Sequence, residues 1–292
     1  MTNAATISFS SSLSPTQWAF DRLFVLCGRA PRASQLAELN RAPGLLPLGA
    51  DGYNNVKRIL CAGSIFLSNP EDEESRCLLV DAQDRDTDCV SMGIEAHIVP
   101  DRDRFRGTAG ILRDAAERLP DDARILVVSA SEVVQSDLNS VFERLVAVDA
   151  DVVLCRDSGG QPVGCWSIRA GNLRAVSPVG YSDFKEQVLP ALAKTQKVKV
   201  VTISEKECVR HWLCDLQSYL HCIRSLAGFQ SGPQVLMEPG VSIASDALVV
   251  DAVLLRGATV ESGAVVARSA VVSGVRVRPG QRVIDRVWTD KA

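Results

Sequence analysis

Residues 240–284 decide the second half of the fold and read GVSIASDALVVDAVLLRGATVESGAVVARSAVVSGVRVRPGQRVI. Small or aliphatic side chains recur there every six residues, at Val241, Ala247, Val253, Thr259, Val265, Val271, Val277 and Val283. A second series follows one residue later, at Leu248, Leu254, Val260, Val266, Val272 and Ile284. A six-residue period is neither helical nor that of an alternating strand. It is typical of hexapeptide repeats, so we predict a short left-handed parallel β-helix that points one side chain of each hexad inward.

The repeat follows Gly232, and we place this β-helix domain at residues 233–292. The span 240–284 amounts to about two and a half coils of roughly eighteen residues. Because a short solenoid has open ends, we expect it to pack on the preceding domain and to contribute to oligomerisation. Some hexapeptide proteins are acyltransferases that use a histidine in or near the coils. No histidine lies within residues 240–284, which leaves that activity as a minor alternative.

Upstream of the repeat, short apolar runs alternate with amphipathic stretches, which predicts a doubly wound α/β domain at residues 21–232. The expected strands are 23–27, 77–80, 97–99, 125–129, 152–155, 164–168 and 198–203. The expected helices are 55–67, 110–118, 138–148 and 183–194. Such apolar strands indicate a mostly parallel, Rossmann-like sheet that is covered on both faces. Ligands bind beyond the carboxyl ends of these strands, so the loops after Leu26, Val99 and Val128 are the candidate site.

The composition narrows the classes of partner. A net charge of −3 and a pI near 5.7 give no general reason to expect nucleic acid or an acidic membrane surface. No apolar run approaches the ~20 residues that cross a bilayer, so neither nucleic acid nor a membrane is an expected partner. Residues 1–20 lack the features of a signal peptide and are predicted to form a flexible tail. Nine cysteines without a CxxC pair favour reduced thiols in a cytoplasmic protein.

Five segments carry a further pattern. In chain order they are LCGRAPRASQLAELNRAPGLLPLG at 26–49, RGTAGIL at 106–112, ILVVSASEVVQSD at 125–137, FKEQVLPAL at 184–192 and HWLCDLQSY at 211–219. Together they resemble the sugar-1-phosphate nucleotidyltransferases (NDP-sugar pyrophosphorylases), which join a sugar 1-phosphate to an NTP and release pyrophosphate. The resemblance spans residues 22–292 and implies the nucleotidyltransferase type of α/β sheet followed by a β-helix.

The resemblance also implies which residues meet the ligand. The residues it assigns to nucleotide or sugar binding are Gly28, Gly107, Thr108, Ala109 and Gly110. Asp215 matches an acidic position that holds Mg²⁺, the cofactor implied for an active member. Thr108 and Asp215 are explained equally well as helix N-caps. Arg102, Arg104 and Arg106 add positive charge nearby, and a solvated loop is their commoner explanation.

The sequence departs from the family where the chemistry is most demanding. Transfer to an α-phosphate gathers dense negative charge, which calls for backbone N–H groups, Arg or Lys and a carboxylate-held metal. The family's loop arginine, lysine and metal-binding aspartate fall on Ala33, Pro43 and Ser131. Arg32 and Glu132 are the adjacent residues that would have to take over as catalytic groups.

A segment is also shorter than in the family. Only residues 156–163 separate two expected strands, where the family carries a lobe that holds the sugar phosphate.

We therefore expect a nucleotidyltransferase-like protein with impaired catalysis. Its expected role is that of a regulatory or scaffolding subunit that binds a nucleotide or nucleotide sugar. Its expected assembly is a homo-oligomer, or a hetero-oligomer with an intact family member. The alternative is an active nucleotidyltransferase in which Arg32, Glu132 and Asp215 form a rearranged site.

Overall fold

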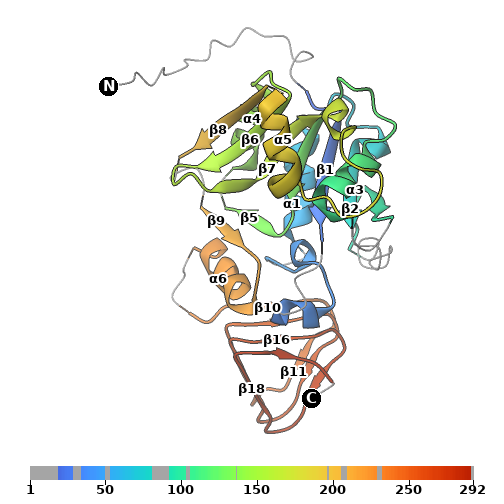
Figure 1. The fold of residues 1–292 in the computed structure, drawn as a ribbon. Coiled ribbons are helices and arrows are strands. Elements are labelled where there is room, and N and C mark those ends of the chain that lie inside the picture. The colour runs from blue at the N-terminus through green and yellow to red at the C-terminus, as the bar shows by residue number, and fades with distance from the viewer. Residues whose placement is uncertain are drawn as a thin grey trace.

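The computed structural model describes residues 19–28, 34–49, 53–80, 92–102, 106–135, 137–195, 197–204, 209–228 and 232–290. The tail predicted at residues 1–20 lies almost entirely outside this part of the chain. The largest sheet has the strand order β3-β2-β1-β4-β7-β6-β8 (Figure 1). Its strands are β1 (Arg22–Cys27), β2 (Arg76–Val80), β3 (His97–Pro100), β4 (Arg124–Ser129), β6 (Val152–Asp157), β7 (Pro162–Arg169) and β8 (Val198–Ile203).

The sheet is mostly parallel, as the apolar runs predict. Only β7 runs against its neighbours β4 and β6, and the other four pairings are parallel. All seven strands expected from the sequence are present in it. Helices cover both faces, which explains why the central strands are apolar on both sides.

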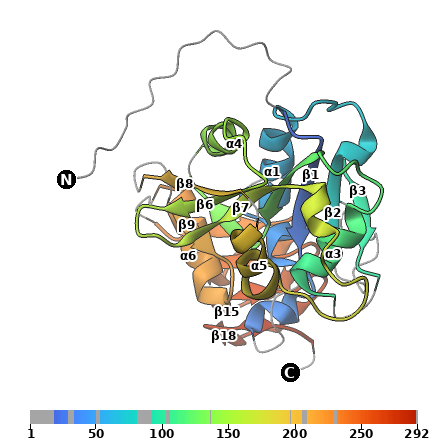
Figure 2. The same ribbon diagram turned by 45° about the horizontal axis from the view of Figure 1, so that its top comes forward.

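The two faces of the sheet carry different helices (Figure 2). Helices α1 (Asn55–Ser64) and α4 (Leu138–Val146) pack on one face. Helix α3 (Gly107–Ala115), the π-helix η7 (Phe184–Val188) and α5 (Leu189–Thr195) pack on the other. The 3₁₀ helices are η2 (Gln35–Leu39), η3 (Pro43–Leu45), η5 (Glu73–Ser75) and η6 (Ala170–Leu173).

A small ribbon and one helix follow the carboxyl edge of the sheet. Strands β5 (Glu132–Val134) and β9 (Arg210–Trp212) form an antiparallel pair, and α6 (Leu216–Leu226) follows β9. One face of the ribbon carries the buried Val133 and His211. The ribbon and α6 lie between the large sheet and the C-terminal strands (Figure 1).

The C-terminal strands stack in three parallel sheets, which we call the coil region (residues 235–288). Its strands are β10 (Val235–Met237), β11 (Ser242–Ile243), β12 (Leu248–Val250), β13 (Ala252–Leu254), β14 (Thr259–Val260), β15 (Val265–Ala267), β16 (Ala270–Val271), β17 (Arg276–Val277), β18 (Arg282–Ile284) and β19 (Val287–Trp288). The sheets are β10-β13-β16-β19, β11-β14-β17 and β12-β15-β18. This β-helix-like stack confirms the predicted arrangement of short parallel strands in its broad form.

The predicted repeat is wrong at one corner of each coil. Val235 pairs with Ala252 and Ser242 with Thr259, so a coil takes 17 residues and not eighteen. The inward track therefore advances by six, six and then five residues. Its buried members are Leu254, Val260, Val266, Val271, Val277 and Val283. The track takes Leu254, Val260 and Val266 from the second series and Val271, Val277 and Val283 from the first.

The short corner has a distinct backbone. Asp251, Arg268 and Asp285 occupy it in successive coils, and all three have positive φ angles of 46–55°. Aspartate tolerates this left-handed region better than most side chains. The Arg268 guanidinium donates to the Asp285 carboxylate over 2.6 and 2.7 Å, which ties two of these corners together.

The coil region packs on the α/β part through the outer face of its first sheet. Val253, Ala270 and Val287 are buried there against α6 and η2. Val253 belongs to the predicted inward series but points outward, because this outer face is also apolar. A nearly buried ion pair, Arg41–Glu238 at 2.6 Å, adds a polar contact between the two parts.

Within the described residues, no helix combines the length and the apolar character needed to cross a membrane. The described cysteines are thiols and most of them are buried.

Candidate functional site

The carboxyl ends of β1 and β4 lie side by side, because the two strands are parallel neighbours in register. Gly28 follows β1 and is exposed, and no atom lies within 4 Å of the position that a Cβ would take there. Gly28 therefore borders open space at the edge where ligands bind such sheets. Arg32 and Ala33 lie outside the described residues, so the structure does not place that predicted arginine.

Glu132 follows β4 in the short strand β5, and its carboxylate is already paired. Arg210 of β9 donates from Nη1 to Glu132 Oε1 over 2.9 Å. The same guanidinium contacts Asp157 Oδ2 at 3.2 Å and donates to the carbonyl oxygen of Pro162. A Cβ at Gly164 would lie 2.5 Å from Glu132 Oε2, so this glycine makes room for the carboxylate. Glu132 is thus held beside the sheet.

Ser131, at the position of the family's metal-binding aspartate, has a hydroxyl 3.0 Å from that of Ser129. Asn55 of α1 holds the backbone on either side of Ser131. Its side-chain amide donates to the carbonyl oxygens of Ala130 and Glu132, both over 2.9 Å. The turn after β4 therefore carries hydroxyls and paired carbonyls.

The segment LLPLG is a packed core element. Pro43, where the resemblance implies a lysine, is buried in η3, and the residues up to Leu48 are buried with it. A Cβ at Gly44 would lie 2.9 Å from the backbone oxygen of Ala130, so the chain passes close to the end of β4. The hydroxyl of Tyr219 donates to the carbonyl oxygen of Pro47 over 2.6 Å. This hydrogen bond joins the segments 26–49 and 211–219. Pro43 provides no cation where the resemblance implies a lysine.

The Gly107–Gly110 turn at the start of α3 is covered by residues 177–183 of the same chain. Gly107 has a φ of +70°, and a Cβ there would lie 2.6 Å from the carbonyl oxygen of Ser182. The N–H of Ala109 donates to that same oxygen over 3.0 Å. Ala109 is fully buried, and its N–H is one backbone donor of this turn that is already used.

Thr108 and Arg106 hold the covering segment in place. Thr108 does not cap its own helix, whose N-cap is Arg106; its hydroxyl accepts from the N–H of Phe184 over 3.0 Å. The same hydroxyl donates to Asp183 over 3.2 Å. Thr108 therefore ties α3 to the start of the π-helix.

Arg106 is 2% exposed, which corrects its interpretation as part of a solvated loop. Its guanidinium donates to the carbonyl oxygens of Ser177 and Gly180 and to the Asp114 carboxylate. Gly110 leaves space for this side chain, since a Cβ there would lie 3.1 Å from its Cζ. The arginine is consumed by internal contacts.

Asp215 acts as the N-cap of α6. Its Oδ1 accepts from the N–H of Ser218 over 2.7 Å, and the Ser218 hydroxyl accepts from the N–H of Asp215 over 3.1 Å. This backbone hydrogen bond from Ser218 keeps the pKa of Asp215 below its usual range. No group of three or more His, Cys, Asp or Glu side chains suited to a metal occurs among the described residues. Asp215, the carboxylate that the resemblance assigns to Mg²⁺, is engaged as a helix cap.

Three residues at this edge have no counterpart among the sequence predictions. Arg210, Asp157 and Trp212 share the edge with Glu132, and Trp212 lies directly opposite Glu132 in the ribbon. The Trp212 side chain is 65% exposed. The three-residue strands β5 and β9 are too short to show an alternating pattern, so the sequence holds no signal for this pairing.

The expected loss of a sugar-phosphate lobe agrees with the hairpin of β6 and β7. Asp157 accepts from the N–H of Gln161, and the connection between the strands is residues 158–161. Nothing in this connection is long enough to cover a sugar.

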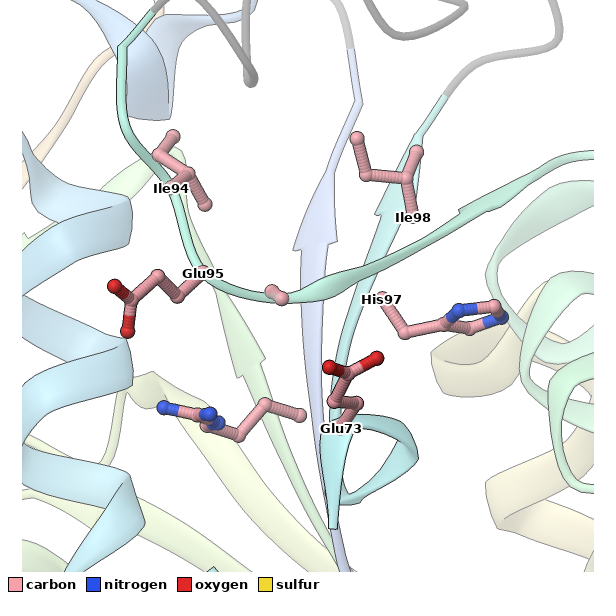
Figure 3. Close-up of a pocket in the computed structure, with 7 residues that line it drawn as sticks. Glu73, Ile94, Glu95, His97 and Ile98 are labelled. Carbon is pink, nitrogen blue, oxygen red and sulfur yellow. The ribbon is translucent and has the colours of Figure 1, made fainter. Parts of the chain in front are cut away.

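A cavity of about 560 Å³ lies elsewhere, at the amino ends of β2 and β3 (Figure 3). Glu73, Arg76, Glu95 and His97 line it together with Ile94, Ala96 and Ile98. Parallel sheets bind ligands at the opposite end of their strands. We therefore place the candidate site at the carboxyl edge and not in this cavity.

No family model matches the chain, and no curated protein matches it. Among solved structures, it is similar to HddC from Yersinia pseudotuberculosis, with 12% sequence identity and a TM-score of 0.51. The match covers 70% of this chain and 99% of HddC. At this identity, the similarity is one of fold.

Proposed function

We propose that this chain is a nucleotidyltransferase-like protein that does not catalyse transfer and serves as a regulatory or scaffolding subunit. One observation carries the proposal: described residues that the resemblance assigns to the ligand or the metal, and Glu132 beside them, are engaged in contacts within the chain. Glu132 pairs with Arg210, Asp215 caps α6, and Ser182 occupies the Ala109 donor.

The fold gives the proposal its frame. HddC, the structural neighbour, is similar in fold to this chain over 99% of its own length. The family-like segments occur here in the family's order. The reaction itself is what the chain is proposed to have lost.

Transfer to a phosphate requires positive charge around the reacting group. A sugar phosphate that attacks a triphosphate needs cations and open N–H donors placed beforehand around the reacting phosphate. Pro43 offers neither a charge nor an N–H, and Ser131 offers no carboxylate. Arg106 holds residues 177–183, and Arg210 pairs with Glu132. Both guanidinium groups already donate to carboxylates and carbonyl oxygens. Freeing either one would leave buried or half-buried acceptors without a partner.

Binding without transfer is compatible with the open part of the edge. Gly28 borders free space, and Trp212, on the ribbon that follows the same edge of the sheet, presents an exposed aromatic ring. A nucleotide or nucleotide sugar that binds there would meet a ring to stack on and no metal. The proposed partners are such a ligand and either a second copy or an intact relative.

Binding is tested by isothermal titration calorimetry with a panel of NTPs and nucleotide sugars, with and without Mg²⁺. The proposal predicts either no binding or binding that does not depend on Mg²⁺. Trp212→Ala is expected to weaken any such binding, and Tyr53→Ala, at another exposed ring, serves as the matched control. Mg²⁺-dependent binding accompanied by pyrophosphate release would favour the active enzyme instead.

A further inference from the structure

The two ends of the coil region differ in how well they cover its inward side chains. In the first coil, Met237 is 56% exposed, and Ile243 and Val249 are partly exposed. The residues stacked on these three in the second coil, Leu254, Val260 and Val266, are at most 1% exposed. No described segment therefore covers the apolar interior at the first-coil end.

The last-coil end is closed by Trp288. This residue continues the track of Met237, Leu254 and Val271, and it packs on the interior of the coil region. Its indole N–H reaches the carbonyl oxygen of Arg276, on a different sheet, over 3.3 Å. Val277 and Val283, the inward residues beneath it, are fully buried.

The first-coil end also presents backbone. β10, β11 and β12 each stand at the end of their sheet and have a strand partner on one side only among the described residues. Unpaired strand edges readily pair with strands of another chain. At this end, the apolar floor formed by Met237, Ile243 and Val249 is surrounded by three such strand edges. Each coil inside the stack presents the same arrangement to the coil next to it.

We propose that the first-coil end binds the first-coil end of a second copy of this chain, which forms a two-fold dimer. A head-to-tail stack would need an open last-coil end, and Trp288 closes that end. Within the described part of the chain, the first-coil end is the one open end of this shape. The contact is therefore isologous, and the assembly closes at two copies.

Strand direction is consistent with this arrangement. Seen from its own first-coil end, each copy turns in the same sense. When two such ends face each other, the apposed strands therefore run antiparallel, which is the more stable pairing. The flexible thioether of Met237 can adapt its packing to a second apolar end.

The contact is one coil wide and thus smaller than the roughly 800 Å² per partner of a standard interface. We therefore expect a reversible monomer–dimer equilibrium, measured by sedimentation velocity from about 1 μM to about 1 mM protein. Met237→Asp is expected to weaken the dimer at least about tenfold, because it places charge on the apolar floor. Leu248→Asp is the matched control: Leu248 is also 56% exposed, but it points outward from the first coil.

A second variant tests the closing role of Trp288. Trp288→Ala opens the last-coil end and is expected to add assemblies larger than a dimer. Circular dichroism checks that each variant keeps its fold, and Met237→Gln replaces the aspartate variant if that protein loses β signal.

Three results would overturn the proposal. They are a wild-type monomer over the whole concentration range, equal weakening by the Met237 and Leu248 variants, and a Trp288→Ala protein that associates no further than wild type. None of these measurements depends on whether the chain releases pyrophosphate.

Discussion

Glu132 and Arg210 form an ion pair with a 2.9 Å contact at the carboxyl edge of the main sheet, where the fold is expected to meet its ligand. The Glu132 side chain is 11% exposed and the Arg210 side chain 29%. A carboxylate held this way supports the turn after β4. It is poorly placed to leave its partner for a metal, because the half-buried guanidinium would then lose a carboxylate partner.

The first prediction concerns this pair. Glu132→Gln removes a charge-assisted hydrogen bond and is expected to lower the free energy of unfolding by about 2 kcal/mol. The measurement is urea denaturation followed by circular dichroism. The matched control is Glu117→Gln, which breaks the exposed Arg102–Glu117 pair and is expected to cause no measurable loss. Equal effects of the two changes would contradict a structural role for Glu132.

The turn before α3 gives a second prediction. Gly107→Ala places a Cβ 2.6 Å from the Ser182 oxygen at a φ of +70°, and a loss of about 2 kcal/mol or more is expected. Gly28→Ala meets no neighbouring atom and is expected to change stability by less than about 0.5 kcal/mol. The same denaturation experiment compares them. If Gly107→Ala were as stable as Gly28→Ala, Ser182 would not cover this turn.

Asp215 supplies a third prediction, in which a cap and a metal ligand behave differently. Asp215→Ala removes the cap of α6 and is expected to cost about 1 kcal/mol, whereas Asp215→Asn keeps an acceptor and is expected to cost less. Mg²⁺ is expected to leave the melting temperature of wild type unchanged. A rise in melting temperature with Mg²⁺ that is absent in both variants would identify Asp215 as a ligand instead.

The fourth prediction concerns how the free energy of unfolding depends on pH. Burial, and secondly the neighbouring His221, lower the pKa of His211 from its usual 6.5. Between the two pKa values the unfolded chain binds more protons than the folded one. The free energy of unfolding is therefore expected to fall as the pH drops below about 6.5, down to the folded-state pKa. Urea denaturation across this range tests it, and His211→Gln is expected to flatten the slope.

The main sheet could be predicted from the sequence, whereas the contacts that occupy the candidate site could not. The central strands of the sheet are apolar on both faces, so each one is visible as a short run. The contact of Ser182 with Gly107 and Ala109 joins residues more than seventy positions apart, and nothing in the local sequence of either segment announces it.

The coil region shows a different limit. The sequence shows the repeat length of about six residues, but it does not show which residue of each repeat points inward. Val253 is buried on the outer face against α6, whereas Leu254 is buried inside. Two adjacent apolar residues then both fit the pattern. The one-residue shortening at Asp251, Arg268 and Asp285 turns one inward track into two apparent series.

We propose that the described residues which the resemblance assigns to the ligand and the metal are occupied by contacts within the chain. Pyrophosphate release tests it most directly, with purified protein, Mg²⁺, and a full set of NTPs and sugar 1-phosphates. We predict a rate equal to that of the protein-free mixture for every pair of substrates. Mg²⁺-dependent release that disappears in Asp215→Ala would contradict the account.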